Sequence, residues 1–355
     1  MTAADRPHGR RAARMPQPIS VRAALAEATA LHGIAELPPI SLDELTARAS
    51  LMTRTDRKYL VPIASAHRLL HALDGDVRVL EIGGARTFGY RSTYYDTADL
   101  VSYRTAATGR RRRFKVRRRD YLDTGASFLE VKTLTGRGQS AKVRAELAAS
   151  GDRGAMLSAS ALAHATATAP SAHAPATAPA SGPAPAPATA SGRAPAPAPA
   201  LPLPSDTAAL TGALREFVDT ALADAGVPSP EAALLPQLRT EYDRTTLLVE
   251  SEGARLTIDG ALTWTDLLTG AEADAEESAP VPPRAAAPDA GRHQLAGMVV
   301  VETKSGSRAG TADRLLWSAG HRPVRISKYA TGLALLRGDL SANRWHRTLG
   351  TLRAA

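Results

Sequence analysis

The sequence contains no cysteine and few aromatic residues, and each shortage removes a class of function. Without thiols, the 355-residue chain can form no disulfide, no thiolate zinc site and no cysteine nucleophile. Aromatic residues make up 4% of the chain. They do not interleave with the basic residues as base-stacking sites require, so we expect no nucleic acid partner. No apolar run approaches the roughly 20 residues that span a bilayer, so we expect a cytoplasmic protein.

Acidic residues are also in deficit. The 44 Lys and Arg residues exceed the 35 Asp and Glu residues, which gives a formal net charge of +9 at pH 7. Such an excess favours an anionic partner: phosphate compounds, nucleic acid or an acidic membrane surface. Composition alone does not choose among these partners, so the positions of the charges along the chain must decide.

Residues 150–206 are nearly all Ala, Pro, Ser, Thr and Gly. They cannot bury enough apolar surface to offset the entropy of ordering, so we predict a disordered Ala/Pro-rich linker. We also predict a flexible loop over 270–297 and a weakly ordered segment over 1–35. The two remaining halves are short and rich in charge. We therefore expect one domain over 36–350 with the linker as an insertion, because a long surface insertion adds little loop-closure entropy.

The apolar patterning predicts an α+β fold dominated by strands, without the strand–helix alternation of a parallel sheet. The predicted strands cover 57–62, 87–96, 112–121, 127–133, 238–251, 254–262, 298–305 and 323–326. The predicted helices cover 65–73, 208–225, 311–319 and 329–337. Ser65 and Thr311 are predicted N-caps, and a turn at 123–125 predicts a hairpin.

Charged residues alternate with apolar residues in these strands. Residues two apart share a strand face, so Lys115, Arg117 and Arg119 lie on one side while Phe114 and Val116 lie on the other. The pattern recurs as Glu-x-Lys at 130–132 and at 302–304, and as Tyr-x-Arg at 242–244.

Two interpretations of this alternation remain open. For any single strand, a sheet with one face in water is the simpler one. Taken together, the strands instead predict an enclosed cavity with many cations and few anions, which a polyanion would complete. A hard divalent cation, Mg²⁺ or Mn²⁺, takes one or two carboxylates and phosphate oxygens. This chemistry makes Glu302 and Glu130 candidate metal ligands.

Nine short motifs occur in the order known for one family. They lie at 54–61 (RTDRKYLV), 91–104 (RSTYYDTADLVSYR), 117–121 (RRRDY), 128–133 (FLEVKT), 140–144 (SAKVR), 239–245 (RTEYDRT), 255–259 (RLTID), 300–304 (VVETK) and 325–332 (RISKYATG). Each motif alone is weak, but the ordered set is fairly specific. The chain resembles a VTC domain, the polyphosphate-polymerase branch of the triphosphate tunnel metalloenzymes.

The resemblance implies an eight-stranded antiparallel β-barrel, the triphosphate tunnel, with flanking helices. The predicted catalytic residues are Lys58, Arg117, Arg119, Lys132, Arg244 and Lys328. The predicted nucleotide- and phosphate-binding residues are Lys142, Arg255, Lys304, Arg325 and Tyr242. The predicted metal ligands for Mn²⁺ or Mg²⁺ are Glu302 and Glu130.

The implied activity is a polyphosphate polymerase that transfers the ATP γ-phosphate to phosphate or polyphosphate. The implied partners are ATP, polyphosphate and a separate membrane protein at the inner face of the membrane. Arg54 and Asp56 precede Lys58 where the related hydrolases and cyclases carry Glu-x-Glu-x-Lys, which argues against those activities. Arg325 stands where a lysine is expected. A tri- or polyphosphatase and a non-catalytic polyphosphate-binding module remain as alternatives.

Overall fold

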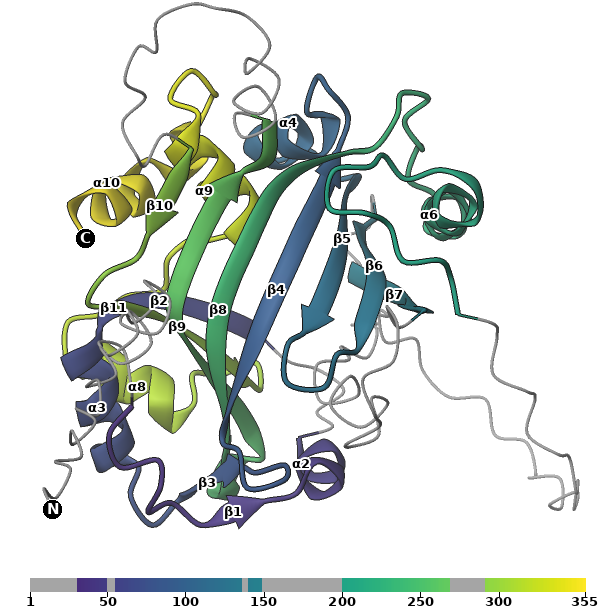
Figure 1. Cartoon of the computed structure of the whole chain (residues 1–355). Coiled ribbons are helices and arrows are strands. Elements are labelled where there is room, and N and C mark those ends of the chain that lie inside the picture. Colours follow the sequence, from purple (N-terminus) through teal and green to yellow (C-terminus); the bar gives the residue numbers. More distant parts are fainter. Residues whose placement is uncertain (1–30, 50–54, 136–139, 149–199, 269–290) are drawn as a thin grey trace, which may run out of the picture.

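The computed structural model describes residues 31–49, 55–135, 140–148, 200–268 and 291–355 (Figure 1). Most of the predicted linker and loop, and nearly all of the first 35 residues, lie outside this part. Where the predictions do overlap it, two boundaries change. Leu201 pairs with Leu147, and Asp206 forms ion pairs with Arg118 and Arg239. The second ordered half therefore begins before residue 207. Residues 292–294, inside the predicted loop, form a strand.

The described strands form one eleven-stranded sheet, antiparallel except for the parallel β1–β3 pair. Its main path is β2-β11-β9-β8-β4-β5-β6-β7. The strands are β1 (Pro39–Ile40), β2 (Thr55–Pro62), β3 (Val77–Leu80), β4 (Thr87–Asp96), β5 (Arg113–Tyr121), β6 (Ser127–Leu134), β7 (Ser140–Leu147), β8 (Leu235–Val249), β9 (Ala254–Asp266), β10 (Arg292–Gln294) and β11 (Met298–Ser305). Along this path β11, β9 and β8 from after the predicted linker lie between β2 and β4 from before it, so both halves build the same sheet.

Helices lie on the outside of the sheet and at one end of it (Figure 1). They are α2 (Leu42–Arg48), α3 (Ile63–Ala72), α4 (Val101–Ala107), α6 (Gly212–Asp224), α8 (Thr311–Ser318), α9 (Lys328–Leu336) and α10 (His346–Ala354), with 3-10 turns η1 (Glu250–Glu252) and η3 (Asn343–Trp345). None of the helices in the described ranges is both long and apolar enough to span a bilayer.

The apolar positions of the strands face outward onto these helices, because the alternating charges take the inner face. Val61 of β2 and Val301 of β11 pack with Leu69 of α3 and Leu316 of α8. Toward the other end of the strand path, the outward residues of β5 and β6 pack against α6 in the same way. Two of the hydrophobic clusters thus lie outside the sheet. A third packs with residues of α9 and contains, from the face that carries the charges, Tyr94, Tyr242 and Phe128. The rest of the concave face is left to polar side chains.

The predicted closed barrel of eight strands is not what the described residues show. Strands β2 and β7 stand at the two ends of the main path and do not pair with each other in the described part of the chain. Side chains of both strands, Lys58 of β2 and Lys142 of β7 among them, nevertheless line one cavity. The sheet thus curves around a shared space, and its two edges are separated by charged side chains.

Several local predictions also change. The segment 323–326 is not a strand, because only one backbone bond, from Val324 N to Lys58 O at 2.7 Å, ties it to β2. Ser65 is not a cap, because α3 begins two residues earlier, after Pro62. Thr311 is the first residue of α8, and the carboxylate of Asp313 caps that helix by accepting from Gly310 N at 3.0 Å.

The start of α9 is fixed by close packing against β9. The indole Nε1 of Trp264, which is fully buried, donates to the carbonyl oxygen of Lys328 at 2.7 Å. A Cβ atom on Gly332, one helical turn later, would collide with the indole ring. Tyr329 donates a 2.6 Å hydrogen bond to the buried carboxylate of Asp96. These contacts hold the first turn of α9, and with it the side chain of Lys328, against the sheet.

Replacing Gly332 with alanine should therefore destabilise the protein. The added methyl group must displace the Trp264 ring from a packed core, which costs about 1–3 kcal/mol. Urea unfolding followed by circular dichroism measures the difference. Gly338→Ala is the matched control, because a Cβ there meets nothing within 4 Å. Equal stability of the two variants would contradict this account of α9.

Candidate active site

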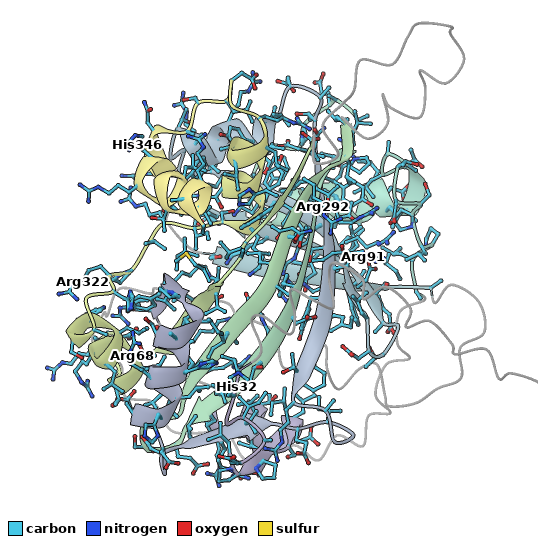
Figure 2. All side chains as sticks on the ribbon, turned by 60° about the vertical axis from the view of Figure 1, so that its left-hand side comes forward. His32, Arg68, Arg91, Arg292, Arg322 and His346 are labelled. Carbon is cyan, nitrogen blue, oxygen red and sulfur yellow. The ribbon has the colours of Figure 1, made fainter. Side chains whose placement is uncertain are left out.

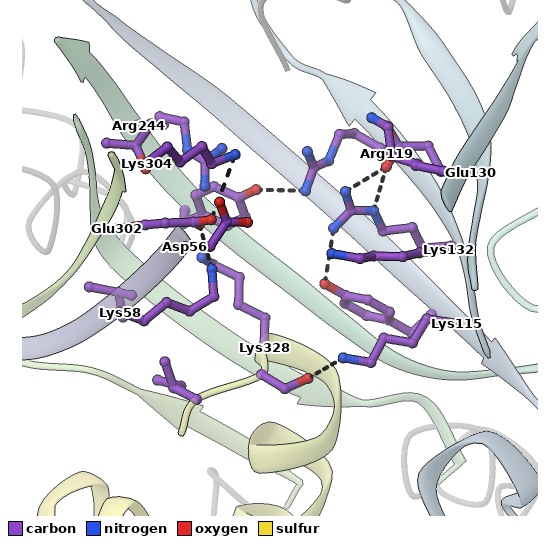
Figure 3. Close-up of a pocket in the computed structure, with 18 of the residues that line it drawn as sticks. Asp56, Lys58, Lys115, Arg119, Glu130, Lys132, Arg244, Glu302, Lys304 and Lys328 are labelled. Atoms are coloured by element: carbon purple, nitrogen blue, oxygen red, sulfur yellow. Dashed lines mark hydrogen bonds and ion pairs between the residues drawn. The ribbon is translucent and has the colours of Figure 1, made fainter. Parts of the chain in front are cut away.

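One polar cavity of about 350 Å³ lies on the concave face of the sheet. Its lining comes from strands of both halves of the chain and from the start of α9. Ten basic side chains and three carboxylates line it. The basic residues are Lys58, Lys115, Arg117, Arg119, Lys132, Lys142, Arg244, Arg255, Lys304 and Lys328, and the acidic ones are Asp56, Glu130 and Glu302. Figure 3 shows the labelled side chains among them, such as Lys58, Lys132 and Glu302, pointing into the same space from facing parts of the sheet.

Three lysines lie side by side across neighbouring strands. Lys132 of β6 is the register partner of Lys115 on β5 and of Lys142 on β7. Like charges placed directly opposite each other destabilise a sheet. Lys132 itself donates no hydrogen bond and forms no ion pair in the described part of the chain. Burial, and then the charge of Lys58, lower its pKa. A bound anion would relieve the repulsion within this lysine row.

Glu130 holds the next group of cations together. Its carboxylate accepts from Arg117 at 2.6 Å and from Lys142 at 2.9 Å, one on each oxygen. Burial would raise the pKa of Glu130, but the charges of Arg117, Arg119 and Lys142 outweigh it and lower that pKa far below its usual range. Glu130 is therefore ionised, and it neutralises only part of the surrounding charge.

Glu302 stands on the opposite side of the cavity. Its Oε2 lies 2.6 Å from Lys58 Nζ, and its Oε1 lies 3.6 Å from Lys304 Nζ. Burial opposes ionisation of this carboxyl group, but the nearby charges of Lys58, Lys304 and Arg244 hold its pKa well below the ordinary value. Asp56, the register partner of Lys304 on β2, lines the cavity beside it (Figure 3).

Asp259 positions two further cations from beneath the cavity. Arg244 makes a bidentate pair with this carboxylate, at 2.6 and 2.9 Å, and Lys328 binds it from the start of α9. The ammonium of Lys328 also lies 4.2 Å from the ring centroid of Tyr242, a cation–π contact. The hydroxyl of Tyr242 in turn accepts from Arg119 at 3.0 Å. Because Asp259 is itself fully buried, it fixes both cations while they reach into the cavity.

The structure places nearly all the predicted site residues in this one cavity. The exception is Arg325, whose side chain is exposed and outside the lining. Ile326, the next residue, lines the cavity instead. The roles of the predicted site residues in binding or catalysis stay predictions.

Some lining residues were absent from the prediction. Lys115, Asp56, Tyr94 and Ser327 line the cavity, and Lys115 Nζ donates to Ser327 Oγ at 2.8 Å. The period-two alternation of β5 does mark Lys115, because it shares a face with Arg117. No sequence pattern marks the role of Asp259, because its contact with Lys328 joins residues 69 positions apart in the sequence.

A divalent cation would find suitable ligands at only one part of the cavity. Within the described ranges, no group of three or more His, Cys, Asp or Glu side chains gathers as a metal site. Mg²⁺ and Mn²⁺ need fewer protein ligands when phosphate oxygens supply the rest. Glu302 and Asp56 fit that pattern. Glu130 fits it less well, because cations lie within 2.9 Å of both its oxygens, whereas the Oε1 atom of Glu302 is 3.6 Å from Lys304 Nζ.

The comparison with protein families agrees with this geometry. The model of the VTC domain matches residues 53–337, a range that contains every described residue of the cavity lining. The chain therefore belongs to the VTC domain family, which confirms the resemblance carried by the ordered motifs. A comparison with curated proteins finds no match.

Three solved structures show a distant likeness. A Hippeastrum protein described as a candidate adenylyl cyclase with a dominant triphosphatase activity is 13% identical, with a TM-score of 0.35, over 81% of this chain and 97% of that one. A candidate adenylate cyclase from Vibrio parahaemolyticus is 10% identical, with a TM-score of 0.32, over 79% and 98%. A Pyrococcus horikoshii protein is 9% identical, with a TM-score of 0.30, over 77% and 94%. These likenesses carry no functional assignment.

Lys115 should couple anion binding to pH. Burial, followed by repulsion from Lys132, lowers the pKa of Lys115 to about 7. A bound anion favours the charged lysine and raises this pKa again. Tripolyphosphate binding above about pH 7 should therefore take up protons, and affinity should fall by up to about tenfold per pH unit. Calorimetry in buffers of different ionisation heat measures the uptake. In Lys115→Gln, which keeps a donor for Ser327, the number of protons taken up on binding should shrink. An unchanged proton uptake would contradict the assignment of this uptake to Lys115.

Lys132 and Arg244 should respond differently to truncation. Lys132→Ala removes a cation that forms no ion pair among the described residues, so tripolyphosphate should bind about 10–100-fold more weakly, the equivalent of about 1.5–3 kcal/mol for a charged hydrogen bond. The melting temperature should not fall. Arg244→Ala leaves the buried Asp259 with one partner fewer, so the free energy of unfolding of this variant should drop by about 3–5 kcal/mol. Calorimetric titration measures the affinity of each variant, and thermal melting measures its stability. A loss of stability in Lys132→Ala would refute the predicted difference between the two variants.

Proposed function

We propose that this protein is a polyphosphate polymerase that transfers the γ-phosphate of ATP to phosphate or to a growing polyphosphate chain. The observation that carries the proposal is the excess of cations in one cavity, above all the lysine row formed by Lys115, Lys132 and Lys142. A single carboxylate ligand would not balance ten basic groups. A chain of phosphates presents repeated negative charge along its length, which matches basic groups spread over neighbouring strands and the start of α9.

The acid–base state of the cavity favours transfer to phosphate over transfer to water. Attack by water is helped by a general base whose pKa lies near the working pH. Glu130 and Glu302 have pKa values far below that range because cations surround them, so they accept protons poorly. An acceptor phosphate is already an anion and needs no base. Lys115, whose pKa is about 7, returns to its charged form when phosphate binds.

The residues of the cavity then have simple roles. Phosphoryl transfer needs in-line positioning and stabilisation of charge on the transferred group, with no covalent protein nucleophile. Lys58, Lys132 and Lys328 approach from three sides and can hold donor and acceptor phosphates together. Arg117 and Arg244 are kept in place by Glu130 and Asp259, so their guanidinium groups are preorganised. Glu302, with Asp56 beside it, would hold a Mg²⁺ or Mn²⁺ ion, which would supply positive charge to neutralise the phosphates.

The proposal is tested by incubating the purified protein with ATP and Mn²⁺ or Mg²⁺. Polyphosphate and ADP should appear together, with little free phosphate. Gel staining detects the polymer, and chromatography measures the nucleotide. Free phosphate without polymer would instead establish a hydrolase. Binding of polyphosphate without turnover would establish a non-catalytic binding module.

A charge-removing variant tests the assigned carboxylate. Glu302→Gln keeps the shape of the side chain but removes its charge, so turnover should fall by about a hundredfold or more while the fold persists. Glu241→Gln is the matched control, because Glu241 pairs with Arg91 at 2.9 Å across neighbouring strands and does not line the cavity. The control should keep full activity. Full activity in Glu302→Gln would remove this residue from the mechanism.

A further inference from the structure

Two neighbouring arginines stand just beyond the cavity lining. Arg113 begins β5 and lies on the same strand face as Lys115, two residues further along. At about 3.4 Å per residue, its Cα lies about 7 Å past that of Lys115. This is the end of the strand where Ser327 and the start of α9 close the cavity. The cationic face of β5 therefore continues outward past the lining, toward α4 and α9 (Figure 1).

The second arginine, Arg344, is carried by η3. The next residue, Trp345, is buried against Tyr103 of α4, with ring centroids 5.8 Å apart. The hydroxyl of Tyr103 donates to the carbonyl oxygen of Ser341 at 3.0 Å. A Cβ on Gly109, just after α4, would collide with the guanidinium of Arg344. The fold thus leaves a place for this group beside α4, in a segment that lies beyond the range matched by the family model.

No carboxylate in the described ranges pairs with either of these two guanidinium groups. Most partly exposed arginines of the described chain pair with carboxylates, as Arg78 does with Glu44 and Arg86 with Glu81. Within the same described residues, neither Arg113 nor Arg344 forms an ion pair. Arg113 donates at 2.8 Å to the carbonyl of Arg110. Burial, followed by the charge of Arg344, lowers the pKa of Arg113. Two like charges in such surroundings repel each other.

Uncompensated repulsion between two positioned cations is relieved by a shared anion. An arginine fork matches phosphate oxygens in geometry as well as in charge. Three more exposed arginines, at 110–112, precede Arg113. The exposed side of α10, where His346 projects (Figure 2), adds no acidic residue. An anion that already occupies the cavity and extends past Lys115 would meet Arg113 and Arg344 next.

We propose that Arg113 and Arg344 form an outer anion subsite, which binds the phosphate groups of a linear polyphosphate that extend beyond the cavity at its α9 end. The inference rests on the proposed function, because it takes the ligand of the cavity to be a phosphate chain. It adds that this chain leaves the cavity between α4, η3 and the start of β5. The outer subsite therefore acts on long chains and is indifferent to short ones.

Affinities for tripolyphosphate and for long-chain polyphosphate, measured by calorimetric titration at fixed salt, test the proposal. In Arg344→Ala, long chains should bind about three- to tenfold more weakly, as loss of one partly exposed charged contact implies. Tripolyphosphate should bind as in the unaltered protein. Arg344→Glu should enlarge the loss for long chains. Arg353→Ala, which removes an exposed arginine at the end of α10, is the control and should change neither affinity. Thermal melting of Arg344→Ala should show no loss of stability.

The outcomes separate the subsite from the proposed function. If the unaltered protein binds neither ligand, the proposed function fails and the outer subsite fails with it. If it binds both, and Arg344→Ala binds long chains normally, only the subsite fails. Equal weakening of both ligands would make Arg344 part of the cavity or of the fold. Equal effects of Arg344→Ala and Arg353→Ala would reduce the result to general surface charge. Each of the last two results also overturns the subsite.

Discussion

Repulsion among basic side chains on the concave face of the sheet is the constraint on which the rest of the structure depends. Lys115, Lys132 and Lys142 stand opposite one another on neighbouring strands, where like charges weaken a sheet. The carboxylates of Glu130 and Glu302 offset only part of this charge. The remainder must be borne by the fold or balanced by a ligand. Strain of this kind is typical of functional sites and is offset by packing elsewhere.

That packing lies on the opposite face of the sheet. Because the charges occupy the inner positions, the apolar positions of the same strands point outward, and helices α3, α6 and α8 cover them. The start of α9 closes one end of the cavity. Trp264, Gly332 and Asp96 hold it there through contacts with little freedom to adjust. The cavity is therefore rigid where Lys328 enters it, which suits a site that works by positioning charge.

Much of the cavity was predictable because strand alternation is a local property. Residues two apart share a face, so the sequence alone assigns Arg117, Glu130 and Lys132 to the inner side, and it predicts β4 with its observed bounds. The failures concern features that depend on distant contacts. Strands β1, β3 and β10 are too short to show a period, and the role of Asp259 arises only when β9 meets α9. The family resemblance assigned Arg325 to the site, but the structure leaves its side chain exposed and outside the cavity lining.

The difference between local pattern and distant contacts also explains why the charge composition indicated an anionic partner but could not identify it. A net charge of +9 is compatible with many partners when it is spread over a surface. Here ten cations converge on one cavity of about 350 Å³, and their carboxylate partners Glu130 and Glu302 are already ionised and paired. A nucleic acid would be contacted along an open surface with aromatic platforms, whereas this cavity has few aromatic side chains and its charges face each other. Cations that surround a narrow space on several sides favour a thin, highly charged chain, and linear polyphosphate has that shape and charge.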